Sequence, residues 1–340
     1  MDDEKLYEIL KTADDYVSGE HISTILNVSR TAVWKSINRL KSKGCHVMSV
    51  TNRGYKLLDD SDMLSRDELQ KQCRTRMIGR KIEYFAKCTS TNDKAREGEI
   101  RGDEEGSVYI TDLQTGGRGR IGRLWHFEAN MGLAMSILLK PLIPPAQMMP
   151  ISLIGGLAVC KAIEQETGLE CGLKWPNDVI SGGKKIAGIL IETSTVGENI
   201  SFIILGIGIN CNNTVFPQAI AETASSILTQ TGKHCSRKNI IRRVIENFEE
   251  LYFKWIEEYD ESVDFSEAKT SFSYITQYKE RCINIGKSII IQSVAHTQNE
   301  IRGIAKDVTP AGKLVVVTKD GSEITVSSGE VSVRGENGYI

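Results

Sequence analysis

The sequence predicts an α+β protein in three parts: a helical N-terminal domain that ends in a hairpin, a central domain with a mixed sheet, and a small C-terminal β-barrel. Three observations favour this organisation. The chain has 340 residues, which is too long for one ordinary hydrophobic core. Strand-like and helix-like runs mix without regular alternation between about residues 66 and 270, which is typical of an α+β sheet with helices packed on one side. From about residue 275 the runs become short and strand-like.

The first 60 residues carry the pattern of three helices followed by a hairpin. Apolar residues recur at helical spacing within 6–10, 22–26 and 33–40, with a turn at Asn27-Val28. Ser29 is a good N-cap for the third helix, and Gly44 suits the position just past its end. Strand-like runs at 46–50 and 55–58 flank Thr51-Asn52-Arg53-Gly54, which predicts a hairpin with a basic tip. A helix-turn-helix followed by such a hairpin is a winged helix-turn-helix.

Basic charge is concentrated in this domain. From His21 to Leu58 there are seven Lys or Arg residues and no Asp or Glu, whereas the whole chain has a formal net charge of only −2. This bias favours DNA binding, with the third helix in the major groove and the hairpin on the backbone or in the minor groove, over a merely solvated basic face. For Trp34 on the same helix, partial packing is favoured over a DNA contact. The residues predicted to contact DNA are Ser29, Arg30, Thr31, Lys35, Asn38, Arg39 and Arg53.

Beyond a short acidic linker at 59–62, periodicity predicts the elements of the two remaining domains. Strands are expected near 82–87, 107–112, 132–139, 172–175, 186–193 and 201–210. Helices are expected near 66–74, 91–98, 148–167 and 236–260. Near the C-terminus, runs at 313–318 and 322–326 flank Asp320-Gly321, a strong hairpin signal, and further strands are expected at 283–287 and 330–334. These C-terminal strands predict a small SH3-like β-barrel.

The most distinctive segment is Gly116–Trp125, in which four glycines and three arginines precede a tryptophan. Glycines allow the backbone to approach a ligand closely, and arginines bind phosphate or carboxylate through a planar fork. The segment lies between strand-like runs at 108–110 and 133–139. A loop that folds over a bound anion is therefore favoured over a solvated linker or an RGG-like RNA-binding segment.

Three further motifs follow this loop: KWPND at 174–178, KKIAGIL at 184–190 and GIGIN at 206–210. These motifs occur in this order and follow a DNA-binding pattern in the sequence. In this combination the chain resembles the biotin protein ligases, specifically the bifunctional kind that also represses biotin genes. The resemblance extends over the whole chain. It implies a winged helix-turn-helix at 1–60, a biotin- and ATP-binding catalytic domain of the class II synthetase kind at 66–274, and the SH3-like domain at 275–340.

The resemblance implies two half-reactions. Biotin and ATP form biotinyl-5′-adenylate and pyrophosphate, and a specific lysine of a biotin carboxyl carrier protein then attacks the adenylate and releases AMP. The residues suit such chemistry, because joining a carboxylate to a phosphate brings like charges together and calls for cations rather than for a nucleophile. Of five histidines only His126 lies near the motifs, so a covalent acyl-enzyme is not expected.

Lys185 is predicted to be the key charge. It follows a Gly-Gly turn and precedes a buried-looking strand, and in the family pattern this second lysine binds the biotin carboxylate and the α-phosphate. An exposed turn lysine describes Lys184 better. By the same resemblance, Arg118 lines the carboxylate side of biotin and Arg120 keeps the intermediate enclosed. The predicted catalytic residues are Lys185, Arg118, Arg120 and Asp178.

The predicted ligand contacts form two groups. Biotin needs an apolar slot with a few polar groups for its ureido ring; Ser90-Thr91-Asn92 would supply them, although Ser90 or Thr91 would also serve as a plain N-cap. The predicted biotin-binding residues are Ser90, Thr91, Asn92, Gln114, Gly117, Arg118, Gly119, Arg120, Lys185, Gly188 and Gly206. The predicted ATP- or adenylate-binding residues are Arg120, Arg123, Trp125, Lys174, Asn177, Lys185 and Asn210. A second glutamine often follows Gln114 in the family, whereas this chain has Thr115, which leaves the role of that neighbour open.

Asp178 has more than one predicted role. Its carboxylate can hold the Mg²⁺ that accompanies ATP or orient the acceptor lysine, or it can cap Asn177 or a nearby turn. The eight cysteines show no CxxC or Cys/His cluster, so neither a zinc site nor a disulfide framework is expected.

The expected partners are the carrier protein, operator DNA and, with adenylate bound, a second copy of the chain. No signal peptide or membrane-length apolar run is evident, which predicts a cytoplasmic protein without a membrane partner. A biotin-sensing repressor without catalysis is disfavoured by the presence of all four predicted catalytic residues, Lys185, Arg118, Arg120 and Asp178. A ligase whose winged domain no longer regulates is disfavoured by the charge bias, and a lipoate ligase by the glycine-arginine loop and the DNA domain.

Overall fold

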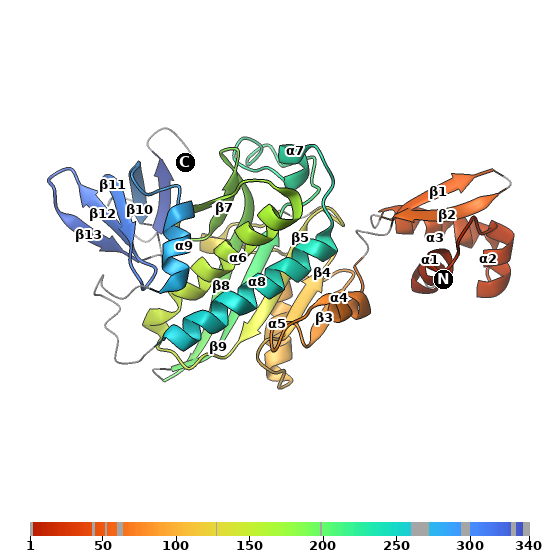
Figure 1. Ribbon diagram of the computed structural model, residues 1–340, viewed down its shortest axis with the longest axis horizontal. Helices are drawn as coiled ribbons and strands as arrows, with labels where there is room; N and C mark the ends of the chain where they lie inside the picture. The colour runs from red at the N-terminus through yellow and green to blue at the C-terminus, as the bar shows by residue number, and fades with distance from the viewer. Residues whose placement is uncertain are drawn as a thin grey trace. The chain divides into compact units, whose positions relative to one another are not determined.

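The protein is described by a computed structural model covering residues 3–42, 45–51, 53–59, 64–126, 128–197, 199–259, 272–293, 300–327 and 331–335 (Figure 1). The chain divides into two compact units: Met1–Ser65 with Ser236–Lys238, and Arg66–Cys235 with Asn239–Ile340. The further boundary expected near residue 274 lies inside the second unit and stays a prediction.

The first unit is a winged helix-turn-helix, as predicted. Helices α1 (Asp3–Lys11), α2 (Gly19–Leu26) and α3 (Arg30–Ser42) precede the antiparallel strands β1 (His46–Val50) and β2 (Gly54–Asp59). Asn27 ends α2 in the left-handed region at φ 50°, and Ser29 Oγ caps α3 by accepting the Ala32 amide at 3.2 Å. The expected apolar faces meet in one core, which includes Leu6, Leu10, Ile22, Val33, Ile37 and Leu40. Gly44 and residues 60–62 of the predicted linker lie outside the described residues.

The second unit is built on a seven-stranded sheet with the strand order β3-β4-β5-β9-β8-β7-β6. The strands are β3 (Ile82–Phe85), β4 (Val108–Thr111), β5 (Leu133–Leu139), β6 (Gly172–Lys174), β7 (Asp178–Ser181), β8 (Lys184–Val196) and β9 (Asn199–Ile209). Strands β3 and β4 pair in parallel and the other neighbours pair antiparallel, which makes the sheet mixed as expected. The sequence pattern missed β7, because this strand has only four residues before the Gly-Gly turn.

Helices cover both faces of this sheet, so the expectation of packing on one side is wrong. Helix α5 (Thr91–Ile100) packs Ala95 into a cluster with Ile204 of β9. Helix α6 (Met149–Thr167) lies on the opposite face, where a methyl group at Gly155 would be 3.3 Å from Leu205. Ile204 and Leu205 are consecutive in a strand and therefore point to opposite faces. In Figure 1, α6 and α8 (Arg237–Glu258) lie side by side across the face of the sheet opposite to α5.

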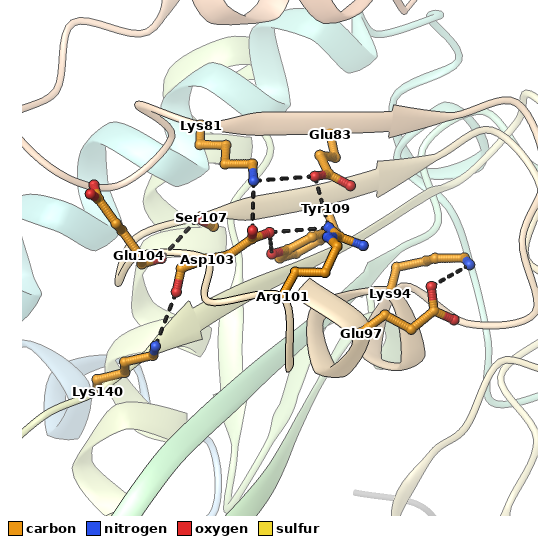
Figure 2. A network of polar contacts seen from close by, with 10 residues as sticks. All are labelled: Lys81, Glu83, Lys94, Glu97, Arg101, Asp103, Glu104, Ser107, Tyr109 and Lys140. Atoms are coloured by element: carbon orange, nitrogen blue, oxygen red, sulfur yellow. Dashed lines mark hydrogen bonds and ion pairs between the residues drawn. The ribbon is translucent and has the colours of Figure 1, made fainter. Parts of the chain in front are cut away.

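A buried polar network fixes the segment that follows α5 (Figure 2). Asp103 is 7% exposed, and its carboxylate accepts hydrogen bonds from Tyr109 at 2.5 Å, Lys81 at 2.7 Å and Arg101 at 3.1 Å. Burial, with the hydrogen bond to Asp103, raises the pKa of Tyr109, so the phenol remains a donor. Because these residues belong to β4 and to the ends of β3 and α5, the network holds α5 in place relative to the sheet.

The C-terminal part is a five-stranded antiparallel sheet with the order β13-β12-β11-β10-β14. Its strands are β10 (Ser288–Ser293), β11 (Glu300–Val308), β12 (Leu314–Thr318), β13 (Glu323–Val326) and β14 (Val331–Gly335). Gly321 closes the predicted hairpin at φ 86°. The strand predicted at 283–287 is wrong: these residues turn from α9 (Ser273–Arg281) into β10, and Asn284 in this turn accepts the Trp175 amide at 2.7 Å. The remaining helices are α4 (Arg66–Gln72) and α7 (Ile227–Thr231).

One stretch contradicts the expectation that no apolar run reaches membrane length. Pro145–Thr167, which contains α6, has 23 residues and is long and apolar enough by composition to cross a membrane. However, 72% of its most apolar part is buried within the protein. This stretch contains the core helix that covers one face of the central sheet.

Candidate functional site

The hairpin between β7 and β8 sets the position of Lys185. Gly182 and Gly183 form its turn with φ values of 54° and 75°, the two left-handed residues of a type I′ turn, which glycine adopts without a Cβ clash. The pairing register shifts between Val179 and Ile180, which places a bulge in β8 beside Lys185. The Lys185 amide donates to the Thr223 carbonyl at 2.8 Å, so the backbone is held on its other side as well.

The Lys185 ammonium lies between a carboxylate and an indole ring. Its Nζ atom is 2.5 Å from Oδ1 of Asp178 and 5.4 Å from the centroid of the Trp125 ring. The Lys185 and Asp178 side chains are only 26% and 15% exposed, so the pair is partly shielded from water. An anion that reaches Lys185 therefore competes with Asp178 for the ammonium.

Asn177 of the KWPND motif has contacts of its own. Its Nδ2 donates to the Ile189 carbonyl at 2.9 Å, and its Oδ1 accepts from Arg120 at 3.1 Å. This residue thus joins the glycine-arginine loop to β8.

Glycines form the floor of a narrow slot beside Lys185. A methyl group at Gly206 would lie 2.5 Å from Oδ1 of Asn92, and one at Gly208 would lie 2.5 Å from Cε2 of Trp125. Gly188 also lines the slot, opposite the same indole. Any larger side chain at these positions of β8 and β9 would fill the slot.

Polar groups at the start of α5 line the other end of the slot. Ser90 caps the helix by accepting the Asn92 amide at 3.2 Å, as the simpler alternative expected, and it also lines the slot. The Thr91 amide donates to Oε1 of Gln114 at 2.9 Å. Ser136 Oγ lies 2.6 Å from Oδ1 of Asn92 and thereby holds this amide in place. Sequence reasoning missed Ser136, although it is the one polar residue in the apolar run LAMSILL and is fully buried.

The glycine-arginine loop is folded as a small hairpin. The Gly119 amide donates to the Arg123 carbonyl at 2.7 Å, and the Trp125 amide donates to the Gly117 carbonyl at 2.9 Å. At its tip Ile121 has a φ of 61°, a strained conformation for a β-branched residue. The hairpin brings Trp125 onto the glycine floor, where its indole N–H has no hydrogen-bond partner among the described residues.

A larger cleft of roughly 900 Å³ adjoins the slot. Arg120, Trp125, Asn177 and Lys185 line both spaces, so they form the boundary between them. The cleft also contains the predicted residues Arg123, Lys174 and Asn210. Arg334 of β14 lines it too; sequence reasoning missed this residue because it lies about 150 residues from the motifs.

Lys174 is the most buried of these cations, with 4% of its surface exposed. Burial lowers the pKa of its ammonium to about 8; the neighbouring cations Lys185 and Arg334 act in the same direction, and Asp178 opposes them. Burial also lowers the pKa of Arg120. The cleft therefore concentrates positive charge that an anionic ligand would stabilise.

Arg118 and Asn210, both predicted ligand contacts, also have partners within the protein. The Arg118 guanidinium is 2.7 Å from Asp93 and 3.1 Å from Glu192. The Asn210 side chain donates to the Ser225 carbonyl at 2.9 Å, and so ties β9 to the segment before α7. Their assignment as ligand contacts stays a prediction.

All seven predicted DNA contacts are exposed on the winged domain. The side chains of Arg39 and Arg53 also contact other side chains of the winged domain. Arg39 is bound to Asp3 of α1, with its Nη2 2.6 Å from Oδ1, and Arg53 lies over the Tyr16 ring at 4.6 Å. Trp34 is 55% exposed, so it is not packed into the core of this domain.

Comparison with known proteins identifies three segments of the chain. Residues 84–210 match the biotin/lipoate A/B protein ligase family, 3–56 match a helix-turn-helix domain, and 285–334 match the C-terminal domain of biotin protein ligases. A bifunctional ligase/repressor BirA of Bacillus subtilis is 35% identical over 250 residues, which cover 73% of this chain and 77% of that protein. The bifunctional ligase/repressor BirA of Escherichia coli is 26% identical over 336 residues, which cover 97% and 96%.

A solved structure resembles three quarters of the chain. The biotin protein ligase from Aquifex aeolicus in complex with biotin and ATP matches with a TM-score of 0.62 and 27% identity, over 75% of this chain and 99% of that one. The glycine-floored slot and the adjoining cationic cleft therefore lie in a domain of ligase fold, and a helix-turn-helix domain precedes this domain in the sequence. This chain belongs to the biotin/lipoate A/B protein ligase family, among the bifunctional ligase/repressors.

Proposed function

We propose that the slot binds biotin and that the adjoining cleft binds ATP, so that the chain forms biotinyl-5′-adenylate and transfers biotin to a lysine of a biotin carboxyl carrier protein. The observation that carries this proposal is the position of Lys185 and Arg120 on the wall shared by the two spaces. A carboxylate in the slot and a phosphate in the cleft would meet at these two cations.

In the first half-reaction, the biotin carboxylate attacks the α-phosphorus of ATP and pyrophosphate leaves. Lys185 exchanges its contact with Asp178 for the two reacting anions, which lowers the repulsion between them. Arg120 adds a second charge, while Lys174 and Arg123 bind the departing pyrophosphate. Ser90, Thr91, Asn92 and Gln114 hold the ureido ring, and Ser136 fixes the Asn92 amide.

In the second half-reaction, the acceptor lysine attacks the carbonyl carbon of the adenylate and AMP leaves. Asp178, released from Lys185, is placed to accept a proton from the attacking amine. The same carboxylate suits a Mg²⁺ ion held mainly by ATP phosphates, since Mg²⁺ uses one or two protein carboxylates in such sites. Within the described ranges no group of three acidic, histidine or cysteine side chains forms a separate metal site.

Incubation of the chain with ATP and labelled biotin tests this function directly. The expected result is labelled biotinyl-adenylate in the absence of an acceptor, and label on the carrier domain when that domain is added. The carrier domain with its acceptor lysine replaced by arginine is the control. Failure to form labelled adenylate would contradict the proposal.

Binding of ATP is expected to weaken as the pH rises through about 8. The charged form of Lys174, which attracts the triphosphate, exists below its pKa of about 8 and is lost above it. The KM for ATP should therefore be constant well below that pH and rise by up to about tenfold per pH unit above it. The Lys174→Arg variant keeps its charge at these pH values. An identical rise in the variant would exclude Lys174 as the titrating group.

We further propose that the winged domain binds operator DNA near biotin genes and that biotinyl-adenylate favours a two-fold dimer, which presents two recognition helices to a palindrome. The support is the exposed basic face of α3 and the hairpin. The glycine-arginine loop would form part of the dimer surface. On the monomer the same loop would dock the carrier protein, so the carrier protein and a second copy of the chain compete for it.

Free thiols at all eight cysteines suit a reducing compartment, and we place the action of the chain in the cytoplasm.

Lys35 and Arg39 are expected to contribute unequally to DNA binding. Lys35→Ala should lower the slope of log affinity against log salt concentration by about one unit, because one phosphate contact is lost. Arg39→Ala should change the slope much less, since Asp3 already binds its guanidinium through two oxygens. Titration of a labelled operator at several salt concentrations measures both slopes. Equal losses would mean that Arg39 leaves Asp3 for the DNA.

A further inference from the structure

Arg118 is bound by carboxylates from two different elements. Its Nη2 is 2.7 Å from Oδ1 of Asp93, in the first turn of α5, and its Nε is 3.1 Å from Oε1 of Glu192, on β8. Arg96, one turn further along α5, approaches the other Glu192 oxygen at 3.2 Å. We call these four residues, Asp93, Arg96, Arg118 and Glu192, the Arg118 cluster.

The Arg118 cluster is electrically balanced without a ligand. Two guanidinium groups face two carboxylates, so the charge of Arg118 is already compensated within the protein. The hydrogen bonds to Asp93 and Glu192 raise the pKa of Arg118 above its usual value.

The two elements that hold Arg118 also form the walls of the slot. Asp93 directly follows Ser90, Thr91 and Asn92, and Glu192 lies four residues beyond Gly188 on the same strand. Arg118 belongs to the first limb of the loop hairpin, whose second limb ends at Trp125 on the glycine floor. The ion pairs of Arg118 therefore fix the loop, and with it Trp125, relative to the slot.

We propose that Asp93 and Glu192 are positioning residues that act through Arg118 to keep the glycine-arginine loop over the slot and so retain the bound adenylate. The inference rests on the proposed function, and it assigns Arg118 to the loop anchor rather than to direct contact with the reacting anions. A single exposed ion pair changes an equilibrium by no more than about fivefold. Four charges contributed by three segments form a network and have a larger combined effect.

The test is the rate at which preformed, labelled biotinyl-adenylate escapes from the full chain after dilution into unlabelled biotin and ATP. Glu192→Gln and Asp93→Asn keep the size of each side chain and remove its charge. Each should raise the escape rate by about three- to tenfold. Glu97→Gln is the matched control: it removes a carboxylate from the same helix, where Glu97 pairs with the neighbouring Lys94 (Figure 2), and it should leave the rate unchanged.

A double-mutant cycle separates the anchor from a direct ligand contact. If Arg118 acts through Glu192, Arg118→Gln and the double variant Arg118→Gln, Glu192→Gln should release adenylate at similar rates. Of these two variants and the wild type, only the wild type should release adenylate faster as the salt concentration rises, because only the wild type keeps the ion pairs of Arg118. Multiplied effects in the double variant, or escape rates equal to that of the wild type in all carboxylate variants, would overturn the anchor while leaving the ligase function intact. A wild-type chain that forms no adenylate would refute the proposed function and the anchor with it.

Discussion

Replacing Lys185 with Ala is expected to slow the formation of biotinyl-adenylate by about 10²- to 10³-fold, the usual cost of removing a group that stabilises developing charge. The ammonium lies on the wall between the slot and the cleft, where the carboxylate and the α-phosphate meet. The loss should appear mainly in kcat, because the charge acts most strongly on the transition state. Biotin-dependent pyrophosphate release measures this rate.

Lys184→Ala is the matched control for this variant. Lys184 occupies the preceding position of the same hairpin, and its ammonium donates to the Ala221 carbonyl at 3.4 Å. Its loss should leave the rate close to that of the wild type, and the fold of both variants should be intact. Pyrophosphate release by Lys185→Ala at nearly the wild-type rate would remove Lys185 from its proposed role.

Gly208→Val is expected to reduce adenylate formation by about 10²-fold or more, mainly through a higher KM for biotin. Even the first carbon of the new side chain would lie 2.5 Å from the Trp125 ring and 2.8 Å from its nitrogen. If the ring moves away, the valine methyl groups themselves occupy the slot. Displacement of a bound group by about 1 Å commonly costs this much in rate.

Ile209→Val tests whether the effect comes from the slot rather than from the strand. Ile209 is the next residue of β9 and is fully buried, and removal of one methyl group there costs roughly 1 kcal/mol of stability. This variant should bind biotin normally. If Gly208→Val retained a normal KM for biotin, the glycine floor would not be the biotin site.

The sequence was most informative where a pattern is local. Helical spacing of apolar residues, an N-cap at Ser29 and the Asp320-Gly321 turn were sufficient to predict the winged domain and the C-terminal hairpin, because each depends on neighbours within a few residues. The β11 strand was missed because charged residues interrupt its apolar ones. The strand predicted at 283–287 was wrong because the apolar residues of this segment lie in a turn. The face covered by each helix could not be predicted, since it depends on which strands pair far apart in the chain.

The residues of the candidate site show the same contrast between local motifs and long-range contacts. The motifs predicted Lys185, Asp178, Arg120 and the glycine floor, and the structure gathers them around two adjoining spaces. Ser136 and Arg334 carry no motif and were found only through the folded arrangement. The partners of Arg118 and Arg39 were likewise invisible, because Asp93, Glu192 and Asp3 become their neighbours through tertiary contacts alone.

We propose that a product made at the ligase site controls DNA binding by the winged domain. The most direct measurement is the affinity of the wild type and of Lys185→Ala for promoter fragments of biotin genes, with and without biotin plus ATP. We expect biotin plus ATP to tighten DNA binding of the wild type by about 5- to 150-fold, the usual range of coupling between sites. Lys185→Ala should not respond, and added carrier domain should reverse the gain in the wild type. A wild-type affinity that is indifferent to biotin plus ATP would contradict the claim.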